Sequence, residues 1–152
     1  MMIAMLRTFR AVFPVLLLSG CMSYPGDPPH STTDLSAHLT GTNEVPPNTS
    51  GAGGRLVAEY SHWNKILTWK LIVNGLSSQP TWMYFHGPDG VGEEAAAIVP
   101  VNVPFDGNEQ RGSATLTEQQ AADLLAGRWY IDIQTKDFPG GEIRGPVVPA
   151  KR

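Results

Sequence analysis

The stretch LVAEYSHWNKILTWKLIV, residues 56–73, decides the fold class of this chain. In its second half every odd position from Leu67 to Val73 is apolar, and Thr68 and Lys70 lie between them. A period of two residues is typical of a half-buried β-strand. The polar segment 61–65 separates this run from another β-rich run, so the stretch predicts a β-hairpin.

Further runs of the same kind continue the pattern on both sides of the hairpin, separated by turn-forming residues. They cover residues 35–42, 81–86, 97–103, 111–116, 129–133 and 141–148. The chain contains 16 Gly and 13 Pro among 152 residues, a content that disfavours a helical bundle. These residues show no three-residue period, which disfavours collagen. We therefore predict an all-β fold, a single antiparallel β-sandwich.

One short helix is predicted near 117–126. Thr117 can cap its N-terminus, and Gln120 three residues later completes a capping box. Gly127 supplies the residue at which a helix commonly ends in the left-handed conformation. We expect this helix to be an addition to the sandwich, because no alternation of strands and helices occurs elsewhere.

Residues 1–20 have the features of an export signal. Arg7 and Arg10 give a positive start without acidic residues, and the apolar stretch 11–18 leads into small residues. The uncharged stretch 11–26 is shorter than the roughly 20 apolar residues that span a bilayer, and it contains helix breakers. A retained transmembrane helix is therefore disfavoured.

The sequence LSGC, Leu18–Cys21, resembles the lipobox of bacterial lipoproteins, in which the cysteine is lipid-modified and becomes the mature N-terminus. An ordinary secretory signal with an incidental cysteine is the alternative. Residue 22 is Met rather than Asp, which in such lipoproteins favours the outer membrane. The resemblance implies a protein anchored by acyl chains such as palmitate on Cys21, facing the periplasm or the cell surface.

The remainder of the chain is divided by composition into a Pro-rich tether at 21–34, a domain at 35–148 and a tail at 149–152. Removal of the signal changes the formal net charge from −3 to −5, since nine basic and fourteen acidic side chains remain. The basic residues do not cluster, so nucleic acid is not an expected partner. The lipid, and not a basic patch, is expected to hold the protein on the membrane.

Three segments of the predicted domain resemble the CHRD domain, named from chordin and also found in microbial exported proteins. They are Leu39–Pro47 (LTGTNEVPP), Phe85–Pro88 (FHGP) and Leu124–Gly145 (LLAGRWYIDIQTKDFPGGEIRG). The resemblance covers 35–148 and implies an immunoglobulin-like or superoxide-dismutase-like β-sandwich. It implies little about chemistry, because the family has no agreed molecular activity.

Bacterial CHRD sequences often carry H-x-H-G-P in the middle and N-V-H-T near the end, a potential set of three histidines. Here the matching positions hold Tyr84 and Gln134, so His86 alone is kept. Copper or zinc at a reduced site, with His38 or His62 as further ligands, is one hypothesis. A hydrogen-bonded structural histidine is the other reading of His86.

Two further sets of residues are candidates for ligand binding. Glu142 and Arg144 are two apart on a predicted strand, so both are expected on one face, where they bind a polar ligand or pair internally. Trp82 and Tyr84 share a face with His86, and with Trp63 they are a candidate aromatic platform for a carbohydrate or a protein.

No catalytic constellation is recognisable, and the G-x-S-x-G signature of serine hydrolases is absent. The first functional hypothesis is therefore a lipid-anchored, non-enzymatic binding or interaction module of the cell envelope, with an envelope protein or a glycan as partner. A copper- or zinc-binding metalloprotein is the alternative, and carbohydrate binding through surface aromatics is a further one.

Overall fold

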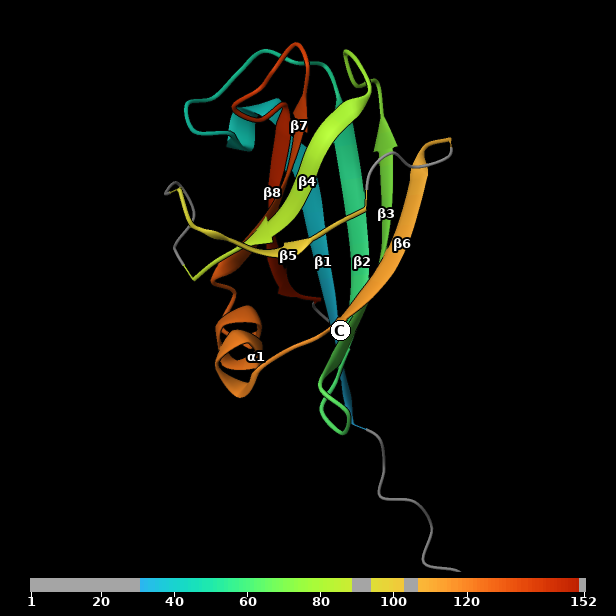
Figure 1. The fold of residues 1–152 in the computed structure, drawn as a ribbon, viewed down its shortest axis with the longest axis vertical. Coiled ribbons are helices and arrows are strands. Elements are labelled where there is room, and N and C mark those ends of the chain that lie inside the picture. Colours follow the sequence, from blue (N-terminus) through green and yellow to red (C-terminus); the bar gives the residue numbers. More distant parts are fainter. Residues whose placement is uncertain (1–30, 89–93, 103–106, 151–152) are drawn as a thin grey trace, which may run out of the picture.

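The computed structural model describes residues 31–88, 94–102 and 107–150, and in these the predicted all-β fold is confirmed (Figure 1). The strands are β1 (Thr32–Thr40), β2 (Gly53–Ser61), β3 (Ile66–Asn74), β4 (Pro80–His86), β5 (Ala97–Pro100), β6 (Glu109–Thr115), β7 (Trp129–Thr135) and β8 (Ile143–Pro149). A 3-10 turn, η1 (Gly41–Asn43), follows β1, and the helix α1 (Glu118–Leu125) lies between β6 and β7.

The eight strands form one antiparallel sheet in the order β5-β4-β7-β8-β1-β2-β3-β6. The sheet curls until β3 faces β4, as Figure 1 shows. The ring centroids of Trp69 on β3 and Phe85 on β4 are 5.1 Å apart, so the two halves pack face to face. The molecule is thus a sandwich made by one nearly closed sheet.

The alternating apolar residues that predicted the hairpin point into the core. Leu67 and Leu71 are fully buried and Trp69 nearly so, whereas Thr68 between them is exposed. A Cβ at Gly112, the partner of Trp69 on β6, would lie 2.5 Å from the indole ring. Glycine at this position therefore gives the tryptophan its space.

The helix is confirmed together with its capping box. The backbone N–H of Gln120 donates to Oγ1 of Thr117, and the backbone N–H of Thr117 donates to Oε1 of Gln120. Gly127 adopts φ +72° immediately after the helix, as expected for a terminating residue. No helix in the described ranges is long and apolar enough to cross a membrane.

The first strand begins at Thr32, three residues before the predicted domain start, in a segment that composition assigned to the tether. Thr32 is paired with Ser61 of β2, and this long-range pairing orders residues whose composition alone is loop-like. The predicted signal, the lipidation candidate Cys21 and most of the tether lie outside the described residues.

Candidate functional site on the outer face of the sheet

The polar residues of the site come from three neighbouring strands, at positions whose side chains point away from the core. Tyr84 on β4 is opposite Asp132 on β7, which is opposite Arg144 on β8. One pair further along, His86 is opposite Tyr130. Their neighbours in the chain, such as Phe85 and Ile131, are fully buried in the core, so strand alternation places the site outside it.

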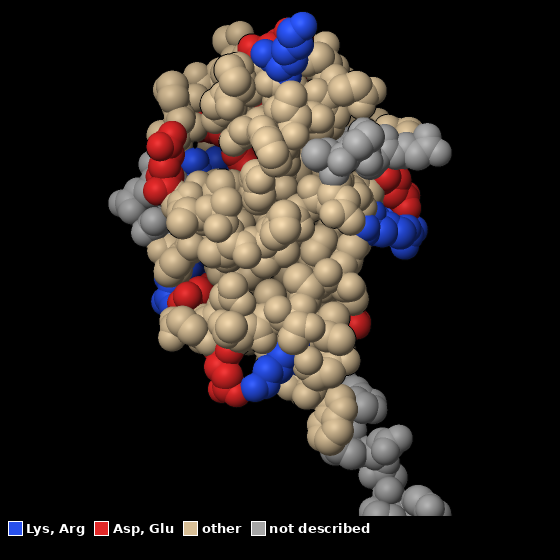
Figure 2. Space-filling view, in the orientation of Figure 1, with Lys and Arg blue, Asp and Glu red and all other residues tan. Residues whose placement is uncertain are grey.

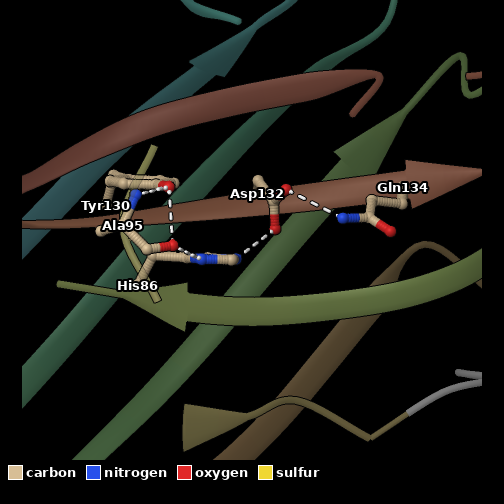
Figure 3. A network of polar contacts seen from close by, with 5 residues as sticks. All are labelled: His86, Ala95, Tyr130, Asp132 and Gln134. Carbon is tan, nitrogen blue, oxygen red and sulfur yellow. Dashed lines mark hydrogen bonds and ion pairs between the residues drawn. The ribbon is translucent and has the colours of Figure 1, made fainter. Parts of the chain in front are cut away.

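His86 is held at both ring nitrogens (Figure 3). Its Nδ1 lies 2.9 Å from the carbonyl oxygen of Ala95, and its Nε2 lies 2.9 Å from Oδ1 of Asp132. A carbonyl and a carboxylate both accept hydrogen bonds, so these two partners favour the imidazolium form, in which both ring nitrogens donate.

The pKa of His86 is accordingly above its usual value of 6.5. Burial acts to lower this pKa, but the hydrogen bond to Asp132 and the one to the carbonyl of Ala95 outweigh it. The structural reading of His86 fits this arrangement, because neither nitrogen keeps a lone pair for a metal.

The Tyr130 ring lies between two cationic groups. The His86 ring stacks on it with centroids 4.8 Å apart and planes 3° from parallel, and the Arg144 guanidinium carbon is 3.4 Å from its centroid. Because β7 runs between β4 and β8, these two groups approach the ring from opposite sides. The hydroxyl of Tyr130 accepts a hydrogen bond from the backbone N–H of Ala95 at 2.9 Å.

A hollow of about 270 Å³ opens over this network. Its lining residues are Glu44, Val45, His86, Glu94, Ala95, Tyr130, Asp132, Gln134, Gly140 and Arg144. Figure 2 shows acidic and basic side chains recessed together in a hollow on the left of the molecule. Convergent polar groups at the floor of a concave surface are the usual form of a small-ligand site.

Glu44 is a buried acid in the hollow, and its burial makes the ionised form unfavourable. It is only 5% exposed, and its Oε1 has no hydrogen-bond partner among the described residues. Its carboxyl group packs against Gly141, where a Cβ would lie 2.6 to 2.7 Å from the carboxyl atoms. Burial, with the negative charge of Asp132, raises the pKa of Glu44 to about 7, although Arg144 and His86 act in the opposite direction.

Glu142 does not belong to this site, so the expectation that it shares a face with Arg144 is wrong. Strand β8 begins only at Ile143, and Gly141 has φ +125°, so Glu142 lies before the regular alternation. Its carboxylate accepts hydrogen bonds from the hydroxyls of Ser50, Ser77 and Thr135 and from the backbone N–H of Ser77, at 2.7 to 2.9 Å. Arg144 instead lies over the Tyr130 ring.

The other two histidines of the metal hypothesis have different surroundings. Nε2 of His62 is 2.8 Å from Oγ1 of Thr33, at the turn between β2 and β3. His38 is exposed on β1, opposite Arg55. No group of three His, Cys, Asp or Glu side chains in the described ranges is arranged to hold a metal ion.

Two of the three aromatic candidates, Trp82 and Tyr84, lie together, and the third, Trp63, lies elsewhere. Trp82 is 56% exposed, and its ring centroid lies 6.0 Å from that of Tyr84 with the planes 20° apart. Trp63 is 65% exposed but lies in the turn after β2, at the lower end of Figure 1, whereas β4 begins at the upper end. The structure brings Trp82 and Tyr84 beside the hollow and leaves Trp63 out.

Tyr130 and Ala95 belong to the network and were not among the sequence-predicted site residues. Tyr130 has a readable signal, since it is in phase with Asp132 and Gln134 and alternates with the apolar Trp129, Ile131 and Ile133. Ala95 has none, because it contributes only backbone atoms from the segment before β5.

The fold and this network define a β-sandwich domain with a polar site on its outer face. The family model for the CHRD domain matches residues 35–147, and the chain belongs to this family. No curated protein and no solved structure shows significant similarity to the chain.

Proposed function

We propose that this CHRD protein is an exported, lipid-anchored, non-enzymatic binding module whose ligand site is the hollow over His86, Asp132 and Arg144. One observation carries the proposal. Charged side chains that are 5 to 8% exposed converge at the floor of a hollow outside the hydrophobic core. Burying charge is unfavourable and contributes little net stability even when paired, which favours a role in recognition.

A binding role is supported over catalysis by the state of His86. Both ring nitrogens are engaged by acceptors, and the imidazolium that this favours has no lone pair for general-base chemistry. The hollow also lacks a Ser or Cys side chain among its lining residues. What it offers a ligand is charge, hydrogen-bonding groups and adjacent aromatic surface.

The position of β1 supports anchoring at the end of the molecule away from the site. β1 begins at the lower end of Figure 1, and Glu44 follows β1 at the upper end. Ten residues separate Cys21 from Thr32, and a fully extended chain of this length reaches about 40 Å at most. A lipid on Cys21 would thus attach to the domain through the start of β1, at the end opposite Glu44.

Lipidation is tested with Cys21→Ser in cells grown with an alkyne-labelled palmitate. We expect the unsubstituted protein to carry the label and to sediment with membranes, whereas the variant carries no label. An unlabelled, membrane-free protein without the substitution would contradict the anchor.

Binding is tested in living cells with a diazirine-bearing side chain in place of Val45, which lines the hollow, and in place of Thr68 as control. Thr68 is exposed on β3, away from the site. A diazirine reacts with protein, glycan and lipid alike, so we expect one defined adduct from position 45 that position 68 does not give. The same adducts at both positions, or none, would refute a ligand site at the hollow.

A further inference from the structure

The strands β4 and β5 carry no Asp, Glu, Lys or Arg side chain. Leu71–Pro88 contains no Asp, Glu, Lys or Arg, and neither does the described segment 95–102. Figure 2 shows the result, a broad uncharged area over the front of the molecule, where β4 and β5 lie. The chain carries 25 charged residues of these types elsewhere, so this face fits a partner without net charge.

Aromatic rings follow one another along β4 at the edge of this face. Trp82 and Tyr84 lie with nearly parallel rings, and the Tyr84 ring meets His86 edge-on with centroids 5.9 Å apart. His86 is fixed in turn by its two hydrogen bonds. The row is therefore held in place at one end, while Trp82 at the other end is 56% exposed.

Planar hydrogen-bonding groups form a second row beside the first. Gln134 on β7 is opposite Trp82, and Asp132 is opposite Tyr84. The amide nitrogen of Gln134 lies 3.4 Å from Oδ2 of Asp132, which orients both groups. Arg144 follows on β8, opposite Asp132.

These two rows match the two kinds of surface on a sugar. A pyranose ring has an apolar face of C–H groups that packs on an aromatic ring, and hydroxyl edges that donate and accept hydrogen bonds. The negative charge of Asp132 is paired with His86, and the Arg144 guanidinium lies over the Tyr130 ring, so Gln134 offers the uncharged hydrogen-bonding group of the row. A hollow of about 270 Å³ beside the rings suits a small repeating unit better than a flat protein surface.

We propose that the outer face of β4 and β7 binds a neutral carbohydrate chain, with a sugar ring packed on Trp82 and its hydroxyls bound by Gln134 and Asp132. This inference rests on the proposed function and names the class of ligand for that site. The adjacent Tyr84 ring extends the contact along the strand.

The test is calorimetric titration of the full-length protein with neutral hexasaccharides of β-linked glucose, xylose and N-acetylglucosamine, and with an acidic oligouronide. A polyoxyethylene detergent is used, because alkyl glycosides would themselves offer a sugar. We expect at least one neutral oligosaccharide to bind and the oligouronide to bind more weakly.

Two tryptophan variants form a matched pair, since both side chains are exposed and lie at opposite ends of the strands. Trp82→Ala is expected to weaken binding about tenfold or more, and Trp82→Phe to restore part of the loss. Trp63→Ala is expected to leave the affinity unchanged. Gln134→Ala is expected to weaken binding without altering the folded state, which thermal unfolding checks.

No binding of any neutral oligosaccharide at millimolar concentration would overturn the inference, as would equal losses in the Trp82 and Trp63 variants. A protein adduct at position 45 in cells, without glycan binding, would overturn it in favour of a protein partner while leaving the binding module in place. Absence of any adduct refutes the proposed function itself, so the two failures are distinguishable.

Discussion

At position 86 a histidine donates from both ring nitrogens, and at position 44 a glutamate is buried with an oxygen left without a partner. The first arrangement favours the charged form of its side chain, and the second disfavours it. Both residues line the same hollow. The protonation of this site is therefore set by local hydrogen bonds and burial.

The charge on His86 is predicted to depend on Asp132. We expect Asp132→Asn to lower the pKa of His86, because the carboxylate that accepts its Nε2 proton is lost. The ring resonances in NMR spectra recorded against pH measure this shift. Asp34→Asn on β1 is the control and should leave the titration of His86 unchanged.

The same bond contributes stability with a defined pH dependence. Because the folded-state pKa is raised, the contribution is fully present below about pH 6.5. It is lost as the pH rises through the folded-state pKa of His86. An unchanged pKa in Asp132→Asn would show that this hydrogen bond does not hold the proton.

Glu44 is predicted to destabilise the protein as the pH rises. Its pKa is 4.5 in a model peptide and about 7 in the fold, so between these values only the unfolded chain ionises. Stability should fall across this range by up to about 3 kcal/mol. Glu44→Gln, which stays neutral, is expected to lack this fall.

Urea unfolding at pH 5 and pH 8 measures the difference, with Glu59→Gln on the exposed side of β2 as control. The control should keep the pH dependence of the unsubstituted protein. If Glu44→Gln loses stability between pH 5 and pH 8 as steeply as the control does, Glu44 is not the buried acid described here.

At the scale of elements, Glu142 joins three segments at the upper end of Figure 1. Its hydroxyl partners come from the loop after η1 (Ser50), from the loop between β3 and β4 (Ser77) and from the end of β7 (Thr135). Burial acts to raise the pKa of Glu142, but the hydrogen bonds from Thr135, Ser77 and Ser50 hold the pKa below its usual value. This carboxylate therefore has a structural role.

Replacing Glu142 by Gln turns one acceptor into a donor that faces other donors. We expect a loss of about 1–3 kcal/mol in the free energy of unfolding at pH 7. The loss should be full above the usual pKa of about 4.5 and should shrink as the pH falls below it and through the lowered folded-state pKa, because protonation removes the same acceptor in the unsubstituted protein. Denaturant unfolding at pH 7 and about pH 3 checks this, and equal losses at both would contradict it.

The elements were predictable from the sequence to a large extent, and the site only partly. Alternation along β3 gave its buried face, and Thr117 with Gln120 gave the helix start, because both signals are local. Alternation cannot say which strands become neighbours, so the meeting of His86 with Tyr130 and Ala95 depends on long-range pairing. Glu142 was misplaced because Gly141, two residues before β8, interrupts the alternation.

At the scale of the whole molecule, the proposed lipid anchor precedes β1 in the chain, and the proposed ligand face lies along β4 and β7. The two exposed tryptophans test this arrangement, since Trp82 lies on the proposed ligand face and Trp63 in the turn after β2. They are comparably exposed, so their intrinsic reactivity toward oxidation is similar.

The most direct measurement is hydroxyl-radical footprinting of the protein in intact cells and after purification, with oxidation at each tryptophan read by mass spectrometry. We predict that Trp82 is protected in cells and reactive in the purified protein, whereas Trp63 reacts in the purified protein and gains no protection from the ligand. Equal reactivity of Trp82 in both states would contradict the claim that the outer face of β4 and β7 binds a ligand.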